Sequence, residues 1–287
     1  MRRLARFLSA EQRHWLWREA VLARKIISRL VYTTSRFLPT SFVAPVKEGL
    51  NPVGHLDYPG KSIKMTVDSS AQLERLRACR KEPETVSWLE SHLRPGDVFF
   101  DIGANVGAYS LVADAITGGQ CTIYSFEPSH GTFASLSKNI LLNDCQARMI
   151  PLHFALWSDT GLMALGFSST APGAALHSLQ TLPPEGGPYL LVPAYRLDDL
   201  VSRLSLRTPN LIKIDVDGDE LAVLRGSEEV LASSSLRSVL VEVDETSESS
   251  LSIRHLMNRL GFRLASTHLH GETSSKVGNC IFERGGE

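Results

Sequence analysis

The residues of this chain that are best suited to hold a ligand form one short turn with the sequence DIGANVG, residues 101–107. Gly103 and Gly107 let the backbone pass close to a ligand, because neither carries a Cβ atom. The amide groups of such a turn, followed by the start of a helix, can hold a carboxylate or a phosphate. Asp101 could accept a hydrogen bond from the ligand or offset its positive charge. The turn therefore predicts ligand contacts from Asp101, Gly103 and Gly107.

The spacing of the glycines separates two classes of nucleoside ligand. A dinucleotide-binding turn has the pattern G-x-G-x-x-G, but from Gly103 the second and third glycine positions hold Asn105 and Ala108. Glu127 ends the next predicted strand, 26 residues after Asp101, where a carboxylate can bind both hydroxyls of a ribose. A glycine turn alone also fits a purely structural connection. Together with Glu127 it favours a nucleoside cofactor, and the glycine spacing favours S-adenosyl-L-methionine (SAM) over NAD.

A second group of acidic residues follows a later apolar strand, in the segment KIDVDGDE at residues 213–220. Asp215 stands at the carboxyl end of that strand, where it could act as a general base towards a substrate hydroxyl. Alternatively, Asp215 and the strand-end residue Glu242 could share a divalent metal that lowers the pKa of the hydroxyl. Two carboxylates are few for a metal site, so we predict no metal and assign the catalytic role to Asp215. The neighbouring acids are predicted to favour the first turn of the next helix; they are Asp217, Asp219 and Glu220.

Three further residues are weaker candidates. Asp159 follows the third predicted strand and could contact the amino group of an adenine, although a plain turn explains it nearly as well. His153 and His177 could each act as a base, but a lone histidine beside a strand is more often packed or exposed than catalytic. The sequence contains no G-x-S-x-G, P-loop or H-E-x-x-H pattern, and each of these would have indicated a different class of enzyme.

The elements that must position these residues alternate as strand, turn and helix from residue 98 onwards. Apolar runs predict seven strands, at residues 98–100, 122–126, 149–156, 211–214, 238–243, 262–265 and 279–282. Near-continuous apolar strands that alternate with helices predict an α/β fold, in which a mostly parallel sheet is covered by helices on both faces. Ligands of such sheets bind outside the carboxyl ends of the strands. The acidic residues singled out above follow or end the predicted strands.

The segments around this sheet are less regular. Clustered prolines and glycines predict a loop or linker at 39–60. Alternating residues predict a short strand at 63–67, and helical spacing predicts a helix at 70–93 that Pro83 interrupts. A long insertion at 157–196, at the ligand edge of the sheet, has strand-like pieces at 162–167 and 189–193. It is predicted to be either a lid or a partly mobile loop.

The N-terminal part of the chain differs in charge from the rest. The net charge of −1 argues against a general nucleic-acid-binding protein, but the first forty residues carry nine Arg or Lys and two Glu, a charge of +7. Residues 10–32 are predicted to form a helix with one apolar stripe. It could lie on an anionic membrane, although packing on the domain or on a partner subunit is favoured, and a transit peptide is disfavoured because serines are few. We predict a basic helical extension and linker at 1–60 and one domain at 61–287.

Composition limits the cellular setting. The four cysteines are scattered along the sequence without close pairs, which predicts reduced thiols rather than a zinc site or a disulfide scaffold. No apolar run is long enough to cross a bilayer, and the N-terminus lacks the apolar core of a secretory signal. We expect a cytoplasmic protein, with peripheral membrane contact through residues 1–40 as a further option.

Six motifs, in this order, resemble those of FkbM-type methyltransferases. They are KEPET at 81–85, DIGANVG at 101–107, FEP at 126–128, LDDL at 197–200, KIDVDGDE at 213–220 and VEV at 241–243. The resemblance covers roughly residues 80–284 and implies the Rossmann-like fold of class I SAM-dependent methyltransferases. It also implies O-methylation of hydroxyl groups on polyketides or sugars, but it assigns no catalytic base. The residues that it implies for SAM binding are Asp101, Gly103, Asn105, Gly107 and Glu127.

Taken together, the residues and the resemblance predict transfer of a methyl group from SAM to a hydroxyl of a sugar, a glycolipid or a natural product. The acceptor is expected to be a small molecule or a glycan, and no oligomeric state is predicted. Two other functions stay open. One is an NAD-linked Rossmann oxidoreductase, and the other is a membrane or scaffold protein whose methyltransferase fold is catalytically idle.

Overall fold

The computed structural model describes residues 26, 29–31, 33, 34, 36–175, 177–184, 186–270 and 276–285. Contacts between residues divide the chain into two units, residues 1–51 and 52–287. Within the helix predicted at 10–32, residues 26 and 29–31 are described and helical, and the remainder lies outside the described residues. None of the described helices is both long enough and apolar enough to cross a membrane.

The first unit contains helix α2 (Thr40–Leu50), in a segment where the sequence predicts a loop. The loop prediction is wrong for residues 40–50, whereas Pro52, Gly54, Pro59 and Gly60 lie outside this helix. Pro39 directly precedes the first turn, where a backbone N–H would have no helical partner. Gly49 lies in the last turn of the helix, and Pro45 lies in its interior.

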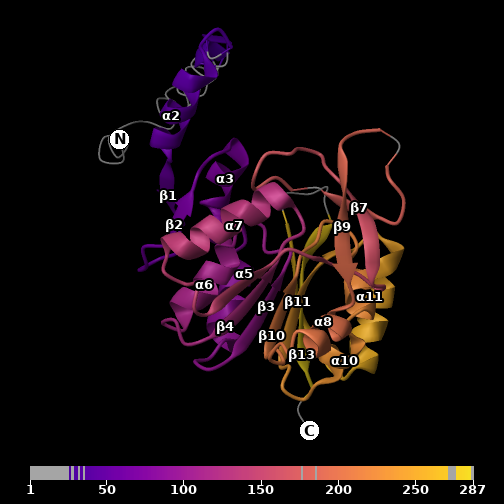
Figure 1. The fold of residues 1–287 in the computed structure, drawn as a ribbon. Coiled ribbons are helices and arrows are strands. Elements are labelled where there is room, and N and C mark those ends of the chain that lie inside the picture. The colour runs from indigo at the N-terminus through magenta and orange to yellow at the C-terminus, as the bar shows by residue number, and fades with distance from the viewer. Residues whose placement is uncertain are drawn as a thin grey trace, which may run out of the picture. The chain divides into compact units, whose positions relative to one another are not determined.

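A seven-stranded sheet forms the centre of the second unit, with the strand order β12-β13-β11-β10-β3-β4-β5 (Figure 1). Its strands are β3 (Val98–Ile102), β4 (Thr122–Phe126), β5 (Met149–Leu152), β10 (Leu211–Ile214), β11 (Ser238–Asp244), β12 (Phe262–Leu269) and β13 (Val277–Arg284). Both pairings of β13 are antiparallel and all others are parallel, so the predicted mostly parallel sheet is confirmed. The chain runs outward from β3 to β5 and then returns to β10, beside β3. Such a reversal of strand order opens a ligand-binding crevice at the carboxyl ends of the strands.

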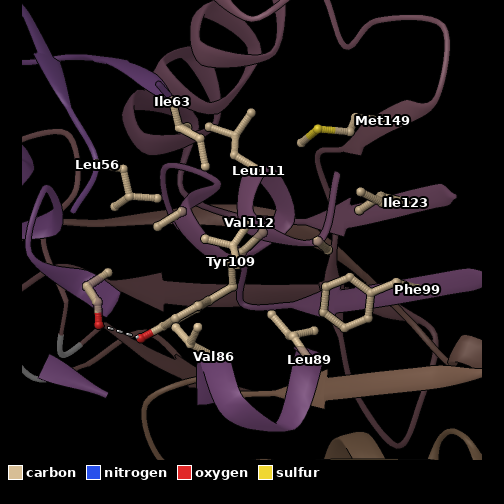
Figure 2. Packing of buried hydrophobic residues seen from close by; sticks show 14 of the residues in the cluster. Leu56, Ile63, Val86, Leu89, Phe99, Tyr109, Leu111, Val112, Ile123 and Met149 are labelled. Atoms are coloured by element: carbon tan, nitrogen blue, oxygen red, sulfur yellow. Dashed lines mark hydrogen bonds between the residues drawn. The ribbon is translucent and has the colours of Figure 1, made fainter. Parts of the chain in front are cut away.

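Two apolar cores cover the two faces of this sheet, which confirms the predicted helices on both sides. On β3, Phe99 belongs to the core beneath helices α5 (Pro83–His92), α6 (Ala108–Ile116) and α7 (His130–Leu142), whereas Phe100 belongs to the core on the other face. Figure 2 shows Phe99 on the same side of the sheet as Leu89 of α5 and Val112 of α6. The helices of the other face are α8 (Leu197–Arg203), α9 (Glu220–Arg225), α10 (Glu228–Ala232) and α11 (Glu248–Arg259).

The segment that precedes β3 is divided more finely than the sequence predicts. The helix predicted at 70–93 is three helices, α3 (Ser70–Arg75), α4 (Ala78–Lys81) and α5. The break before Pro83 is confirmed, and a second break follows Arg75. Before these helices, β1 (Val53–His55) pairs with β2 (Lys64–Thr66) in antiparallel register, and β2 is the short strand predicted at 63–67.

The insertion at 157–196 forms most of a second sheet, with the order β6-β9-β7-β8. Its strands are β6 (Ala155–Leu156), β7 (Gly161–Gly166), β8 (Ser178–Gln180) and β9 (Tyr189–Tyr195). The strand-like pieces predicted at 162–167 and 189–193 are confirmed as β7 and β9, which pair along their length and bury a small core that includes Met163, Leu165 and Val192. The third predicted strand is also divided, since β5 stays in the main sheet and β6 joins the second one.

Candidate active site

A cavity of about 340 Å³ lies at the carboxyl ends of the parallel strands. Its lining includes Gly103, Asn105, Glu127, Asp215 and Glu242, which the sequence singles out. They follow the strands β3, β4 and β10 or lie near the end of β11, so the sheet brings together residues that are far apart in the sequence. A second cavity, of about 240 Å³, shares Gly103, Asn105 and Asp215 with the first. The two cavities therefore adjoin at the glycine turn.

Gly103 lies against Asp215, the residue that follows strand β10. Its φ of +76° lies in the left-handed region, and a Cβ atom built on it would overlap the carbonyl oxygen of Asp215. The amides of Gly103 and Ala104 both donate to the carbonyl oxygen of Phe126, at 3.0 and 2.9 Å. The turn is thus fixed against the end of β10 on one side and against β4 on the other. Position 103 therefore has room for glycine and for no larger residue.

Glu127 holds the same turn from the end of β4. Its buried carboxylate accepts hydrogen bonds from the amide of Asn105 (3.0 Å) and from the amide of Ser129 (2.7 Å). Burial raises the pKa of Glu127 to about 7, although the two amides oppose the rise. The side chain of Asn105 also donates to the carbonyl oxygen of Ala174, at 3.0 Å. The predicted partner of a ribose is therefore also a structural anchor, which the sequence does not reveal.

Three of the predicted SAM ligands line neither cavity. Asp101 is buried and accepts a hydrogen bond from the hydroxyl of Ser110 at 2.6 Å, while its Oδ1 has no hydrogen-bond partner among the described residues. Gly107 has a φ of +87°, and a Cβ atom there would stand 2.6 Å from a methyl group of Leu136. Asp159 is exposed and accepts from its neighbour Ser158. Their contacts with a cofactor stay predictions.

Asp215 is held by a buried lysine that the sequence analysis did not single out. Lys213 is 1% exposed, and its Nζ donates to Oδ2 of Asp215 at 2.7 Å. Burial alone would raise the pKa of Asp215, but the charge and the hydrogen bond of Lys213 outweigh it and lower the pKa. Lys213 also lies directly opposite Asp101 in the register of β10 and β3. A lysine within an otherwise apolar strand is the signal that could have revealed this pair.

The remaining candidates separate into residues inside and outside the cavity. Asp217 and Asp219 line it. Asp219 is the N-cap residue of α9, although its side chain makes no capping hydrogen bond, and Glu220 lies in the first turn of that helix as predicted, whereas Asp217 lies before it. His177 also lines the cavity, and burial lowers its pKa. His153 lies outside, exposed and stacked on Phe133. A further histidine in the lining, His270, was not considered from the sequence.

Known proteins resemble this chain along most of its second unit. The methyltransferase FkbM domain matches residues 101–264. The hexuronic acid methyltransferase AglP of Haloferax volcanii is 29% identical over 187 residues, which cover 65% of this chain and 72% of that protein. The 31-O-demethyl-FK506 methyltransferase FkbM of Streptomyces tacrolimicus is 28% identical over 200 residues, with 61% and 75% covered. Among solved structures, a methyltransferase FkbM from Methylobacillus flagellatus has a TM-score of 0.49 at 12% identity, and the match covers 72% of this chain and 60% of that one.

Proposed function

This chain belongs to the FkbM family of methyltransferases, and we propose that it methylates a hydroxyl group of a sugar, a glycolipid or another natural product. The family domain spans more than half of the chain. Its members transfer methyl groups, and the donor is S-adenosyl-L-methionine. Neither the NAD-linked oxidoreductase nor the catalytically idle scaffold is favoured. The acceptor class is supported by the names of two relatives, which act on a hexuronic acid and on a demethylated natural product.

The residues of the two cavities fit SAM. The observation that carries the proposal is the cradle at Gly103, which a Cβ atom would fill and which adjoins the buried carboxylate of Glu127. That carboxylate would take the ribose hydroxyls. The amides of residues 103–107, which the sequence suggested as donors to the ligand, all donate hydrogen bonds within the protein instead. Apolar lining suited to an adenine ring comes from Phe126, Phe154, Leu156 and Trp157. When bound, SAM supplies an electrophilic methyl group on a positively charged sulfur.

Asp215 is the residue that we assign to orient the acceptor hydroxyl. It lines both cavities, and Lys213 keeps it ionised by lowering its pKa. An ionised carboxylate can accept a hydrogen bond from the acceptor hydroxyl and so hold the hydroxyl oxygen in line with the methyl group. Orienting two reactants in this way is a large part of the catalysis of a bimolecular step. The low pKa also makes Asp215 a weak recipient of the hydroxyl proton. No group of three or more metal-binding side chains occurs among the described residues.

The proposed function is tested by incubating the full chain with methyl-labelled SAM, first with methyl glycosides of hexuronic acids and then with a cell extract. We expect label in an O-methyl group of the product. Calorimetry would be run in parallel with SAM, with its demethylated product and with NAD. Tight binding of NAD without binding of SAM would refute the proposal. Full turnover by an Asp215→Asn variant would remove Asp215 from the mechanism.

The affinity for SAM is expected to increase by about tenfold between pH 6 and pH 8. The pKa of Glu127 is about 7, so its carboxylate becomes ionised, and a better acceptor for ribose hydroxyls, across this range. The effect of pH on folding has the opposite sign. Because the pKa of Glu127 in the folded state lies above its ordinary value, the folded state binds the proton more tightly than the unfolded chain does. The free energy of unfolding therefore decreases as the pH rises from about 4.5 to about 7. Calorimetric titration at each pH measures the affinity. A Glu127→Gln variant should bind weakly and without this pH dependence; an unchanged slope in that variant would contradict the assignment.

We further propose that the N-terminal unit contacts an anionic membrane surface. The first forty residues carry a charge of +7, and α2 exposes Phe42, Val46 and Leu50, which recur every four residues and so share one face of the helix. Basic charge next to an exposed apolar helix face is typical of proteins that lie on membranes. The predicted cytoplasmic location is likewise a proposal, supported by four buried cysteines that are all free thiols.

The membrane proposal predicts that the full chain sediments with vesicles that contain phosphatidylserine and not with vesicles of phosphatidylcholine alone. Binding should weaken at high salt, because surface attraction is screened within a few ångströms at 1 M ionic strength. A Phe42→Ser/Val46→Ser variant should lose most of the bound fraction. The matched control is Leu182→Ser, which changes an exposed leucine of the second unit. Equal loss in the control, or no loss in the double variant, would refute the role of α2.

A further inference from the structure

The second cavity, of about 240 Å³, has many small residues in its wall. They come from α3, α4, the glycine turn, the start of α6 and the insertion, and include Ala71, Ala78, Ala104, Ala108, Gly173 and Ala174. Charged side chains stand where this cavity adjoins the main one, because Arg75, Lys81 and Glu82 line both cavities. A ligand that extends from the main cavity into the second one therefore meets charges of both signs.

Hydrogen bonds fasten α3 to the insertion and so hold Arg75, the last residue of that helix, in place. The hydroxyl of Ser69, which precedes α3, donates to the carbonyl oxygen of Pro172 at 2.6 Å. Nε of Arg75 donates to the next carbonyl oxygen, that of Gly173, at 3.3 Å. The residue after Gly173 accepts a hydrogen bond from the glycine turn. Residues 172–174 thus connect α3 to the turn that holds the cofactor.

The guanidinium group of Arg75 has donors left for a ligand. Among the described residues, its hydrogen bond to Gly173 is the only one that this side chain makes, and no carboxylate forms an ion pair with it. Its two terminal nitrogens have no partner, yet they are not among the fully buried polar atoms without partners, so a ligand in the cavity can reach them. Lys81 and Lys213, the other two cations of the second cavity, each pair with a carboxylate.

Arg75 lies near both carboxylates that the proposed function assigns to the site. Burial raises the pKa of Glu127, and the charge of Arg75 is among the influences that oppose this rise. Burial alone would also raise the pKa of Asp215, but Lys213 and, to a smaller extent, Arg75 lower it. The positive charge of Arg75 therefore acts at the ribose end of the site and at the acceptor end.

Glu82 brings a negative charge to the same cavity. It is 5% exposed, and its Oε2 accepts a hydrogen bond from the hydroxyl of Tyr109 at 2.9 Å, while its Oε1 accepts one from Nζ of Lys81 at 3.0 Å. Each oxygen of a carboxylate can accept two hydrogen bonds, so Glu82 can also accept from an ammonium group. A buried carboxylate attracts such a group and repels an anion.

We infer that the second cavity binds the amino-acid end of SAM, with the carboxylate of the cofactor on Arg75 and its ammonium group on Glu82. The inference rests on the proposed function of the cavities. The two terminal nitrogens of a guanidinium group match the two oxygens of a carboxylate. The amides of the glycine turn cannot take this role, because they all donate within the protein. The carboxylate of an acidic acceptor fits less well, because Glu82 would repel an anion that brings no ammonium group.

Calorimetric titration of the full chain with three ligands tests the inference. The ligands are SAM, decarboxylated SAM and 5′-methylthioadenosine, which lacks the whole amino-acid end. The wild type should bind decarboxylated SAM about 10- to 100-fold more weakly than SAM, the usual contribution of a hydrogen bond between charged groups. Arg75→Met should weaken SAM by a similar factor and bind SAM and decarboxylated SAM within about threefold of each other, because the carboxylate has lost its partner. Its affinity for 5′-methylthioadenosine should stay within about twofold of the wild type, because that ligand does not touch Arg75.

Three further variants separate this role from a general loss of charge or of structure. Arg77→Met is the matched control, since it removes an exposed arginine that follows α3 and lines neither cavity, and it should bind all three ligands like the wild type. Arg75→Lys keeps the charge without the pair of terminal nitrogens, so it should recover part of the SAM affinity. Glu82→Gln should weaken SAM and decarboxylated SAM by the same factor, because both ligands carry the ammonium group.

Two outcomes would overturn the inference. One is equal affinity of the wild type for SAM and decarboxylated SAM, a comparison that needs no variant to fold. The other is an Arg75→Met variant that binds SAM like the wild type; if it also needs more of an acidic acceptor for half-maximal turnover, Arg75 binds the acceptor instead. If the wild type binds neither SAM nor its demethylated product, the proposed function fails, so the two failures can be told apart.

Discussion

A Gly103→Ala variant is expected to lose SAM binding by at least about 100-fold and to unfold more easily. The added Cβ atom would overlap the carbonyl oxygen of Asp215, and the residue has a φ of +76°. Either the turn moves out of the cavity or the ends of β3 and β10 separate, and both changes disturb the cradle. A left-handed conformation at a non-glycine residue adds a further cost of order 1–3 kcal/mol. Calorimetric titration with SAM measures the affinity, and urea unfolding measures the stability.

The structure offers a matched control for this variant. Gly60 has a φ of +74°, almost the same as Gly103, but a Cβ atom there would meet nothing within 4 Å. Gly60→Ala therefore carries the conformational cost without the collision, and it should bind SAM like the wild type. If Gly103→Ala binds SAM within about threefold of the wild type, the turn does not form the cofactor cradle. If the two variants behave alike, the collision with Asp215 is not what matters.

The sheet and part of the site could be predicted because their signals are local. Each predicted strand is an apolar run, and Glu127 and Asp215 each directly follow a strand. Asp101 is a residue for which this local reasoning fails. The sequence predicts a strand at 98–100 with Asp101 in the turn, but β3 continues to Ile102. Asp101 is therefore inside the strand and pairs with Ser110 of α6 behind the cavity.

The rest of the site depends on contacts between distant segments. For example, Nδ1 of His270 in the cavity wall lies 3.6 Å from Oε1 of Glu84 in α5. Strand β13 lies between β11 and β12 and places Asn279 opposite Glu242, where its side chain donates a hydrogen bond to Glu84. Local patterns carry no information about that strand order. The charge of Lys213 within an apolar strand is likewise explained only by the register, which sets this residue opposite Asp101. Charged residues in predicted core strands are thus useful pointers to sites, even when their partners are unknown.

Replacing Lys213 by Met is expected to destabilise the second unit by about 3–5 kcal/mol, the usual cost of removing one partner from a buried ion pair. Lys213 is 1% exposed and lies between Asp215, which it hydrogen-bonds, and Asp101. Without the ammonium group, these two carboxylates would face each other with no positive charge between them. Their pKa values in the folded state would then lie above those of the unfolded chain. Protonation of these carboxylates stabilises the folded variant at low pH, and this stabilisation is lost as the pH rises. The decrease in the free energy of unfolding caused by Lys213→Met should therefore be smaller at pH 5 than at pH 8.

Urea unfolding of the full chain at both pH values measures this effect. A second change, Asp215→Asn in the Lys213→Met background, should recover part of the stability, because it removes one of the two unpaired charges. The control is Lys138→Met, which breaks an exposed pair with Asp68 at 3.7 Å and should cost less than about 1 kcal/mol. A Lys213→Met variant as stable as that control would mean that water or a rearranged side chain compensates the carboxylates. Lys213 would then not be what keeps Asp215 ionised.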